Sequence, residues 1–157
     1  MKLLVFYFIF FSIGCVTTQI SPQQRRAMQV KLFDSSSYNN VFRAFKTVLQ
    51  DEGYIIKNQD MQGGLIVAHS SKGTSSGFAV LAVLSGQQNY QTGTTYEVSV
   101  NLEEIRKNNV ESRVIIQKVA SYNMGGSRGN EILDPKLYRN IYGKVIVEVE
   151  RRKAQKR

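Results

Sequence analysis

Apolar positions follow a helical period in the stretch from Tyr38 to Glu52. Their spacing places all of them on one face of a helix, which predicts an amphipathic helix packed on a core. Residues 34–37 supply several candidate N-cap residues, and Gly53 stands where a glycine commonly ends a helix. The apolar face consists of Val41, Phe42, Phe45, Val48 and Leu49.

Other stretches alternate with period two, which predicts strands with one buried face. Residues 28–33 predict a short first strand, and the runs 54–57 and 65–68 flank a turn-rich stretch that predicts a hairpin. Residues 96–103 alternate most clearly, residues 107–109 form a turn, and residues 110–122 predict the returning strand.

A second helix is predicted after Asp134 and Pro135, which suit the N-cap and the first helical position. Its expected apolar stripe is Leu137, Ile141, Val145 and Val149, widened by Tyr138, Tyr142 and Ile146. The order of elements is therefore β-α-β-β-β-β-α. It predicts an α+β fold in which two helices pack on one face of an antiparallel sheet.

The first residues have the organisation of an export signal. Lys2 precedes an apolar run from 3 to 11, and three residues, 12–14, separate this run from Cys15. The run is about half of the roughly 20 apolar residues that a membrane-spanning helix needs. We predict a signal peptide at residues 1–14, a lipidated cysteine and tether at 15–27, and one α+β domain with a basic C-terminal tail at 28–157.

The placement of Cys15 resembles the bacterial lipobox, in which the thiol is acylated and the preceding signal is removed. Gly14 and Cys15 match its strictest positions, whereas Ser12 stands where an aliphatic residue is usual. The resemblance implies a lipid membrane as partner through acylated Cys15, in a bacterial cell envelope. Val16, which is not Asp, implies the outer membrane facing the periplasm. The alternative is an ordinary secretory signal with an incidental cysteine.

The composition narrows the possible partners and cofactors. The 157 residues carry a formal net charge of +9, which favours anionic partners, but export argues against nucleic acid. We interpret the basic tail as a solvated helix end, with binding to an anionic membrane surface as the alternative. A single cysteine and a single histidine exclude disulfides and Cys/His zinc sites, and we predict no metal and no cofactor.

Candidate catalytic groups do not form a recognisable set. We expect His69 to be exposed at a strand end, without the nucleophile and orienting group that a general base needs. Residues 125–130, GGSRGN, lack the pattern of a phosphate-binding loop and predict a flexible surface turn exposing Arg128. The carboxylates Asp60, Glu103 and Glu104 are expected to be solvated at strand ends. We predict no catalytic residue.

The apolar run from 78 to 84 lies in a stretch rich in Ser, Gly and Gln. It is compatible with a buried strand, with a short helix, or with a loop whose apolar tip contacts a membrane or a partner. The candidate contact surface is Phe78, Val80, Leu81, Val83, Leu84 and Arg128.

The first hairpin resembles that of small envelope lipoproteins, on a pattern formed by Gly53-Tyr54, Ile56, Asp60, Gly64, Ile66 and Ala68. The order of elements over residues 28–150 is similar to the helix-grip domains of the lipoprotein component C of the β-barrel assembly machinery. This resemblance implies a non-enzymatic, membrane-tethered domain that contacts other envelope proteins. The function expected is a binding or scaffolding module. The alternative is an envelope hydrolase that acts on cell-wall or glycan material through carboxylates.

Overall fold

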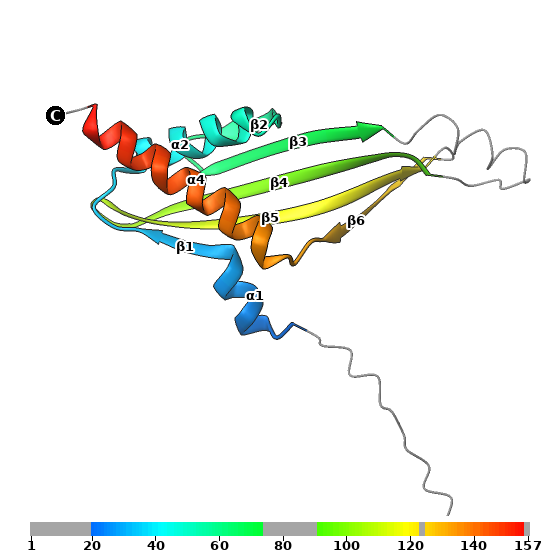
Figure 1. The fold of residues 1–157 in the computed structure, drawn as a ribbon, viewed down its shortest axis with the longest axis horizontal. Coiled ribbons are helices and arrows are strands. Elements are labelled where there is room, and N and C mark those ends of the chain that lie inside the picture. Colours follow the sequence, from blue (N-terminus) through cyan, green and yellow to red (C-terminus); the bar gives the residue numbers. More distant parts are fainter. Residues whose placement is uncertain (1–19, 74–90, 123–124, 156–157) are drawn as a thin grey trace, which may run out of the picture.

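A computed structural model describes residues 20–73, 91–122 and 125–155, and within these residues the α+β fold is confirmed. Figure 1 shows a six-stranded antiparallel sheet with its helices. The helices are α1 (Pro22–Gln29), α2 (Tyr38–Asp51) and α4 (Pro135–Ala154). The strands are β1 (Val30–Phe33), β2 (Ile55–Asp60), β3 (Leu65–Gly73), β4 (Gln91–Arg106), β5 (Asn109–Tyr122) and β6 (Ser127–Glu131).

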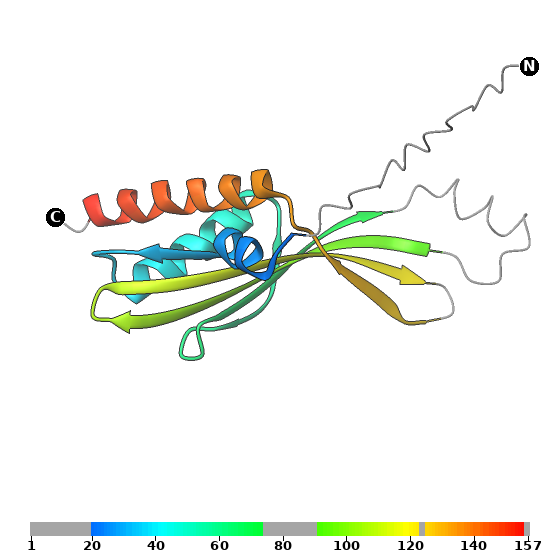
Figure 2. The same cartoon turned by 90° about the horizontal axis from the view of Figure 1, so that it is seen from below.

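The strands follow the order β1-β5-β4-β3-β2, and β6 also pairs with β5. Figure 2 shows α2 and α4 on the same side of this sheet, as the sequence predicted. Alternate residues of the strands therefore face the helices and are buried, among them Ala68, Val100 and Ile116. The other residues face away from the helices, and we call that side the open face.

The core lies between the sheet and the two long helices. All five apolar residues predicted on α2 are buried, and Phe45 lies at the centre of an aromatic group. Its ring stands edge-on to Phe33, at 5.9 Å between centroids, and to Tyr142, at 6.1 Å. Edge-to-face contacts of this kind add to the stabilisation that comes from burial alone. The two long helices thus cover one face of the sheet, and the side chains buried there form the hydrophobic core of the domain.

The helix α4 begins at the predicted cap, since the Asp134 side chain accepts a hydrogen bond from the backbone N–H of Lys136 at 2.8 Å. The apolar stripe predicted for α4 was partly wrong, because Leu137 is 40% exposed and Ile146 is 38% exposed. A repeat of four residues advances 400° around a helix, so it drifts about 40° per step from a fixed direction. The buried face is centred instead on Tyr138, Ile141, Tyr142, Val145 and Val149.

Two segments expected to lack regular structure are regular. Pro22–Gln29 forms α1, so the domain begins before Met28 and the first strand begins at Val30. A capping box starts this helix: Ser21 Oγ accepts from the backbone of Gln24, and the Gln24 side chain accepts from the backbone of Ser21. Residues 127–131 form β6 on the edge of β5, where a flexible turn was expected.

The helix α1 is fixed to the domain through Gln29, which is 1% exposed. Its amide donates to Glu131 and accepts from the Arg113 guanidinium at 3.2 Å, while its backbone carbonyl accepts from the Tyr142 hydroxyl. Arg25 adds an ion pair with Glu131 at 3.4 Å. These contacts join the end of α1 to Arg113, the last residue of β5 that pairs with β1, and to Glu131 of β6.

Candidate functional site

The predicted lipid-attachment and contact residues are mostly beyond the described part of the chain. Cys15 lies outside the described residues, as do Phe78, Val80, Leu81, Val83 and Leu84. Arg128 is described, and it is exposed on β6 as expected, but on a paired strand and not on a flexible turn. No helix among the described ranges is long and apolar enough to cross a membrane.

His69 is not at a strand end, so that expectation was wrong. It lies inside β3, half-buried, opposite Ile55 on β2 and Glu97 on β4. Its Nδ1 is buried and has no hydrogen-bond partner among the described residues. The strand runs on to Gly73 because β4 continues to pair with it, which the polar residues after His69 did not suggest.

The carboxylates lie at the sheet ends and on the open face. Asp60 accepts from the backbone N–H of Gln62 at 2.9 Å and Glu104 from that of Asn108 at 3.1 Å, so both stabilise turns. Glu103 stands directly opposite Glu111 on the neighbouring strand, an unfavourable pairing of like charges that sequence spacing did not predict. The part of the chain described in the structure holds no group of three or more His, Cys, Asp or Glu residues suited to a metal ion.

The open face has a largely apolar centre, with glutamates at a greater or lesser distance on both sides. Val67, Ser99 and Ile115 stand side by side on β3, β4 and β5, all half-buried. One neighbouring row contains Glu97. The row on the other side contains Asn101 and Arg113, whose guanidinium donates to Gln29, and the Glu103–Glu111 pair lies one row further out. The sheet edges expose two further apolar side chains, Ile55 at 63% and Leu32 at 46%. Such a centre with a charged rim has the anatomy of a protein-binding patch.

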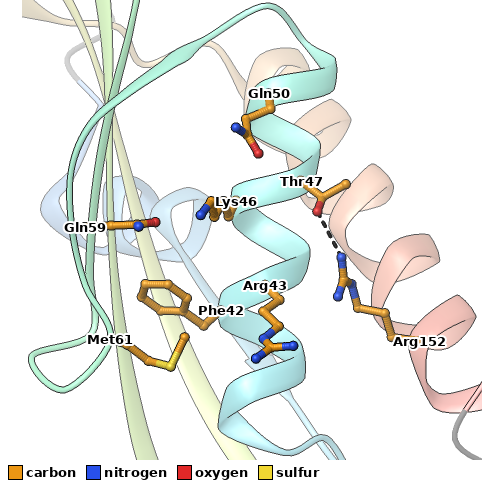
Figure 3. Close-up of a pocket in the computed structure, with 8 residues that line it drawn as sticks. All are labelled: Phe42, Arg43, Lys46, Thr47, Gln50, Gln59, Met61 and Arg152. Atoms are coloured by element: carbon orange, nitrogen blue, oxygen red, sulfur yellow. Dashed lines mark hydrogen bonds between the residues drawn. The ribbon is translucent and has the colours of Figure 1, made fainter.

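A basic pocket lies on the helix-covered side (Figure 3). Its volume is about 570 Å³. Arg43, Lys46 and Gln50 follow one another along the exposed side of α2 at helical spacing. Figure 3 shows the side chains of the β2 hairpin on one side of α2 and Arg152 of α4 on the other. The complete lining is Phe42, Arg43, Lys46, Thr47, Gln50, Gln59, Met61 and Arg152.

The Arg152 guanidinium of this pocket is held in place from two sides. Its Nε donates to Glu148 at 2.7 Å and its Nη2 donates to Thr47 Oγ1 at 2.9 Å. Glu148 also accepts two hydrogen bonds from Arg151 at 2.6 Å, and the bonds from these arginines, led by Arg151, lower the pKa of its carboxyl. No carboxylate is among the residues that line the pocket.

A second groove, of about 490 Å³, lies between α4 and the α1–β1 segment. It is lined mainly by apolar groups, and Tyr138 and Tyr142 form its inner wall. Burial raises the pKa of Tyr142 to about 12, against weaker opposing effects of hydrogen bonds with Ser112 and the backbone of Val114. The raised pKa keeps the Tyr142 hydroxyl neutral, and the neutral hydroxyl donates its proton to the Gln29 carbonyl.

Neither the basic pocket nor the apolar centre was predicted as a site from the sequence. The signal for the pocket was present in the helical spacing of Arg43, Lys46 and Gln50. Gln59 and Arg152 are far from them in the chain, so only the folded structure brings the full set together. The acidic rim likewise depends on the register of β4 against β5.

A scan against protein-family models finds no match for this chain, and a search of curated proteins finds no significant relative.

Proposed function

We propose that this chain is a lipid-anchored binding module of a bacterial cell envelope, attached through Cys15 and acting without catalysis. The observation that carries the binding role is the open face, with its apolar centre next to Glu97 on one side and, beyond the row of Asn101 and Arg113, Glu103 and Glu111 on the other. The partner that fits it is an envelope protein with an apolar patch bordered by lysines or arginines, because opposite charges around an apolar centre fix register and orientation.

The start of α1 limits how far the domain could lie from an acylated Cys15. Ser21 caps this helix six residues after the cysteine, and Gln29 fixes the helix to β5 and β6. Six residues of fully extended chain span about 20 Å. A domain acylated at Cys15 is therefore held close to the membrane surface, where a partner in the same membrane can reach its open face.

Attachment is tested by feeding the producing bacteria an alkyne analogue of palmitate and comparing wild type with Cys15→Ser. We expect the wild-type protein to be labelled, to lose residues 1–14 and to sediment with membranes, and the variant to do none of these. A mature protein that retains Met1–Gly14 overturns the anchor.

The binding role is tested by placing a photo-crosslinking amino acid at Ile115 in living cells. Val147 serves as the control position, because it is 69% exposed but lies on α4, on the other side of the molecule. We expect a discrete adduct from position 115 and none of that mass from position 147. Reversal of the rim, with Glu97, Glu103 and Glu111 changed to lysine, should abolish the adduct. An adduct insensitive to this reversal contradicts the proposed surface.

The same crosslinked adduct distinguishes a binding module from a hydrolase that uses these carboxylates for catalysis. Replacing Glu103 and Glu111 with glutamine removes charge but retains shape. A hydrolase is expected to lose all cellular function in this variant. A binding module keeps its apolar centre, so we expect a weaker adduct and partial function.

A further inference from the structure

The basic pocket on α2 is separate from the open face and is not needed for the function proposed above. It concentrates three cationic side chains from two helices, Arg43, Lys46 and Arg152. Arg43 and Lys46 are in no ion pair among the described residues, while neighbouring cations such as Lys144 and Lys153 are paired with Glu52 and Glu150. The pocket thus holds positive charge that the described part of the protein does not neutralise.

The neutral groups around these cations are also suited to an anion. The amides of Gln50 and Gln59 and the hydroxyl of Thr47 are all able to donate hydrogen bonds. Thr47 Oγ1 accepts from Arg152, which leaves its own proton to donate. Arg152 uses only two of its five N–H groups in the contacts with Glu148 and Thr47. These contacts fix the guanidinium before any ligand arrives, which lowers the entropic cost of binding.

The geometry points to this pocket as a binding site for a phosphate group carried by a small molecule or a lipid headgroup. Guanidinium groups match the oxygens of phosphate with paired hydrogen bonds, and an ammonium group adds an unconstrained point charge. The pocket's volume of about 570 Å³ exceeds what a bare phosphate fills. Met61, which is 40% exposed, contributes apolar surface for the remainder of the ligand.

A phosphate ester fits this pocket better than the flat acidic surface of another protein. Phe42 is 2% exposed and therefore lies below the surrounding surface. The lining residues therefore border a depression, which a small ester can fill and a flat protein surface cannot. The two unpaired cations, Arg43 and Lys46, are suited to a group with two charges and several acceptor oxygens.

The experiment uses the full chain purified in a nonionic detergent from the cells that produce it, so it does not depend on the proposed anchor. Titration calorimetry with glycerol 3-phosphate probes a soluble phosphate ester. Sedimentation with phosphatidylglycerol vesicles, against phosphatidylcholine vesicles as background, probes a lipid headgroup. Binding in the first assay assigns a soluble source, and binding in the second alone assigns the headgroup. Binding in neither overturns the site.

The decisive variant is Arg43→Gln with Lys46→Gln, compared with Lys136→Gln and Arg139→Gln on α4. Both pairs remove two positive charges from the outer side of a helix, but only the first pair lines this pocket, and Lys46 is the one half-buried residue of the four. We expect the pocket variant to bind roughly tenfold or more weakly, since each charge-assisted hydrogen bond contributes about that much. The control should change less than threefold. Equal losses mean that net charge alone is responsible, and overturn the site.

A second variant avoids any change in the number of cations. Gln59→Glu places a carboxylate of nearly the same shape in the pocket. It should weaken phosphate binding while leaving the thermal midpoint of unfolding within a few degrees of wild type. Unchanged affinity in this variant, with the fold retained, contradicts the pocket as the binding site even if the double variant is unstable.

Discussion

The two faces of the sheet are built from alternate residues of the same strands, yet they differ in composition and in charge. The helix-covered face buries Val98, Val100, Val114 and Ile116 almost completely. The open face presents half-buried apolar side chains among glutamates. The outer surface of the helices carries an excess of lysine and arginine, including Arg43, Lys46, Lys136 and Arg139. The residues buried most completely therefore lie on one face of the sheet.

The largest expected effect comes from Gly64→Ala, at the residue before β3, whose alternate side chains belong to the two faces. Gly64 has a φ of +72°, and a Cβ there would lie 2.1 Å from the Leu102 carbonyl oxygen. Backbone strain and overpacking each cost about 1–3 kcal/mol, so we expect a loss of about 4 kcal/mol in urea unfolding. Gly53→Ala is the control. Its φ is +82° with no atom within 4 Å, so about 1 kcal/mol is expected. Equal losses would mean that the contact with Leu102 is unimportant.

Neighbouring isoleucines on β5 compare the two faces directly. Ile116 is 2% exposed under the helices, whereas Ile115 is half-buried on the open face. We expect Ile116→Ala to lower the free energy of unfolding by about 3 kcal/mol and Ile115→Ala by about 1 kcal/mol. If Ile115→Ala proves as costly as Ile116→Ala, the open face contributes to the core as much as the covered one.

Tyr142 tests the polar part of the covered face. Tyr142→Phe removes the hydrogen bond to the Gln29 carbonyl and should cost about 1 kcal/mol at pH 8. The pKa of Tyr142 is raised from 10.0 to about 12. The contribution of its neutral hydroxyl to the free energy of unfolding is therefore fully present below pH 10 and is lost as the pH rises to 12. At pH 11 wild type should have lost about 1.4 kcal/mol through this group. The two proteins should then be nearly equal in urea unfolding, and a constant difference from pH 8 to pH 11 would contradict the raised pKa.

The smallest expected effect concerns the like charges of the open face. Glu103→Gln should raise the free energy of unfolding by about 0.5 kcal/mol, because it relieves repulsion with the opposing Glu111. Glu97→Gln is the control, since Gln117 opposes it, and no gain is expected there. High salt should remove the gain at position 103. A gain of the same size at position 97 would show that net acidity matters and not the pairing.

The sequence predicted the elements whose hydrophobic period was long and regular. The helix ending before Gly53, the alternation from Tyr96 to Leu102 and the cap at Asp134 were all confirmed. The helix α1 was missed because its stabilising features are local caps and not periodicity. Ser21, Pro22 and Gln24 carried that signal. The strand β6 was missed because Gly129 and the two glycines before the strand favour turns, although a glycine is tolerated on an edge strand.

The sites were less predictable than the fold because each is a product of pairing between distant segments. Glu103 and Glu111 become neighbours only through the register of β4 and β5. Arg152 reaches Thr47 only because α4 packs beside α2. Spacing along a single element identifies one side of such a site at most.

The fixation of α1 through Gln29 has a consequence for how a partner is found. If Cys15 is acylated, a rigid helix beginning six residues later leaves the domain little room to move away from the membrane. Its encounters then take place in a thin layer, and a partner confined to the same membrane is met by diffusion in two dimensions. The local concentration of such a partner is set by its density in the membrane, so even a weak open-face contact would be well occupied.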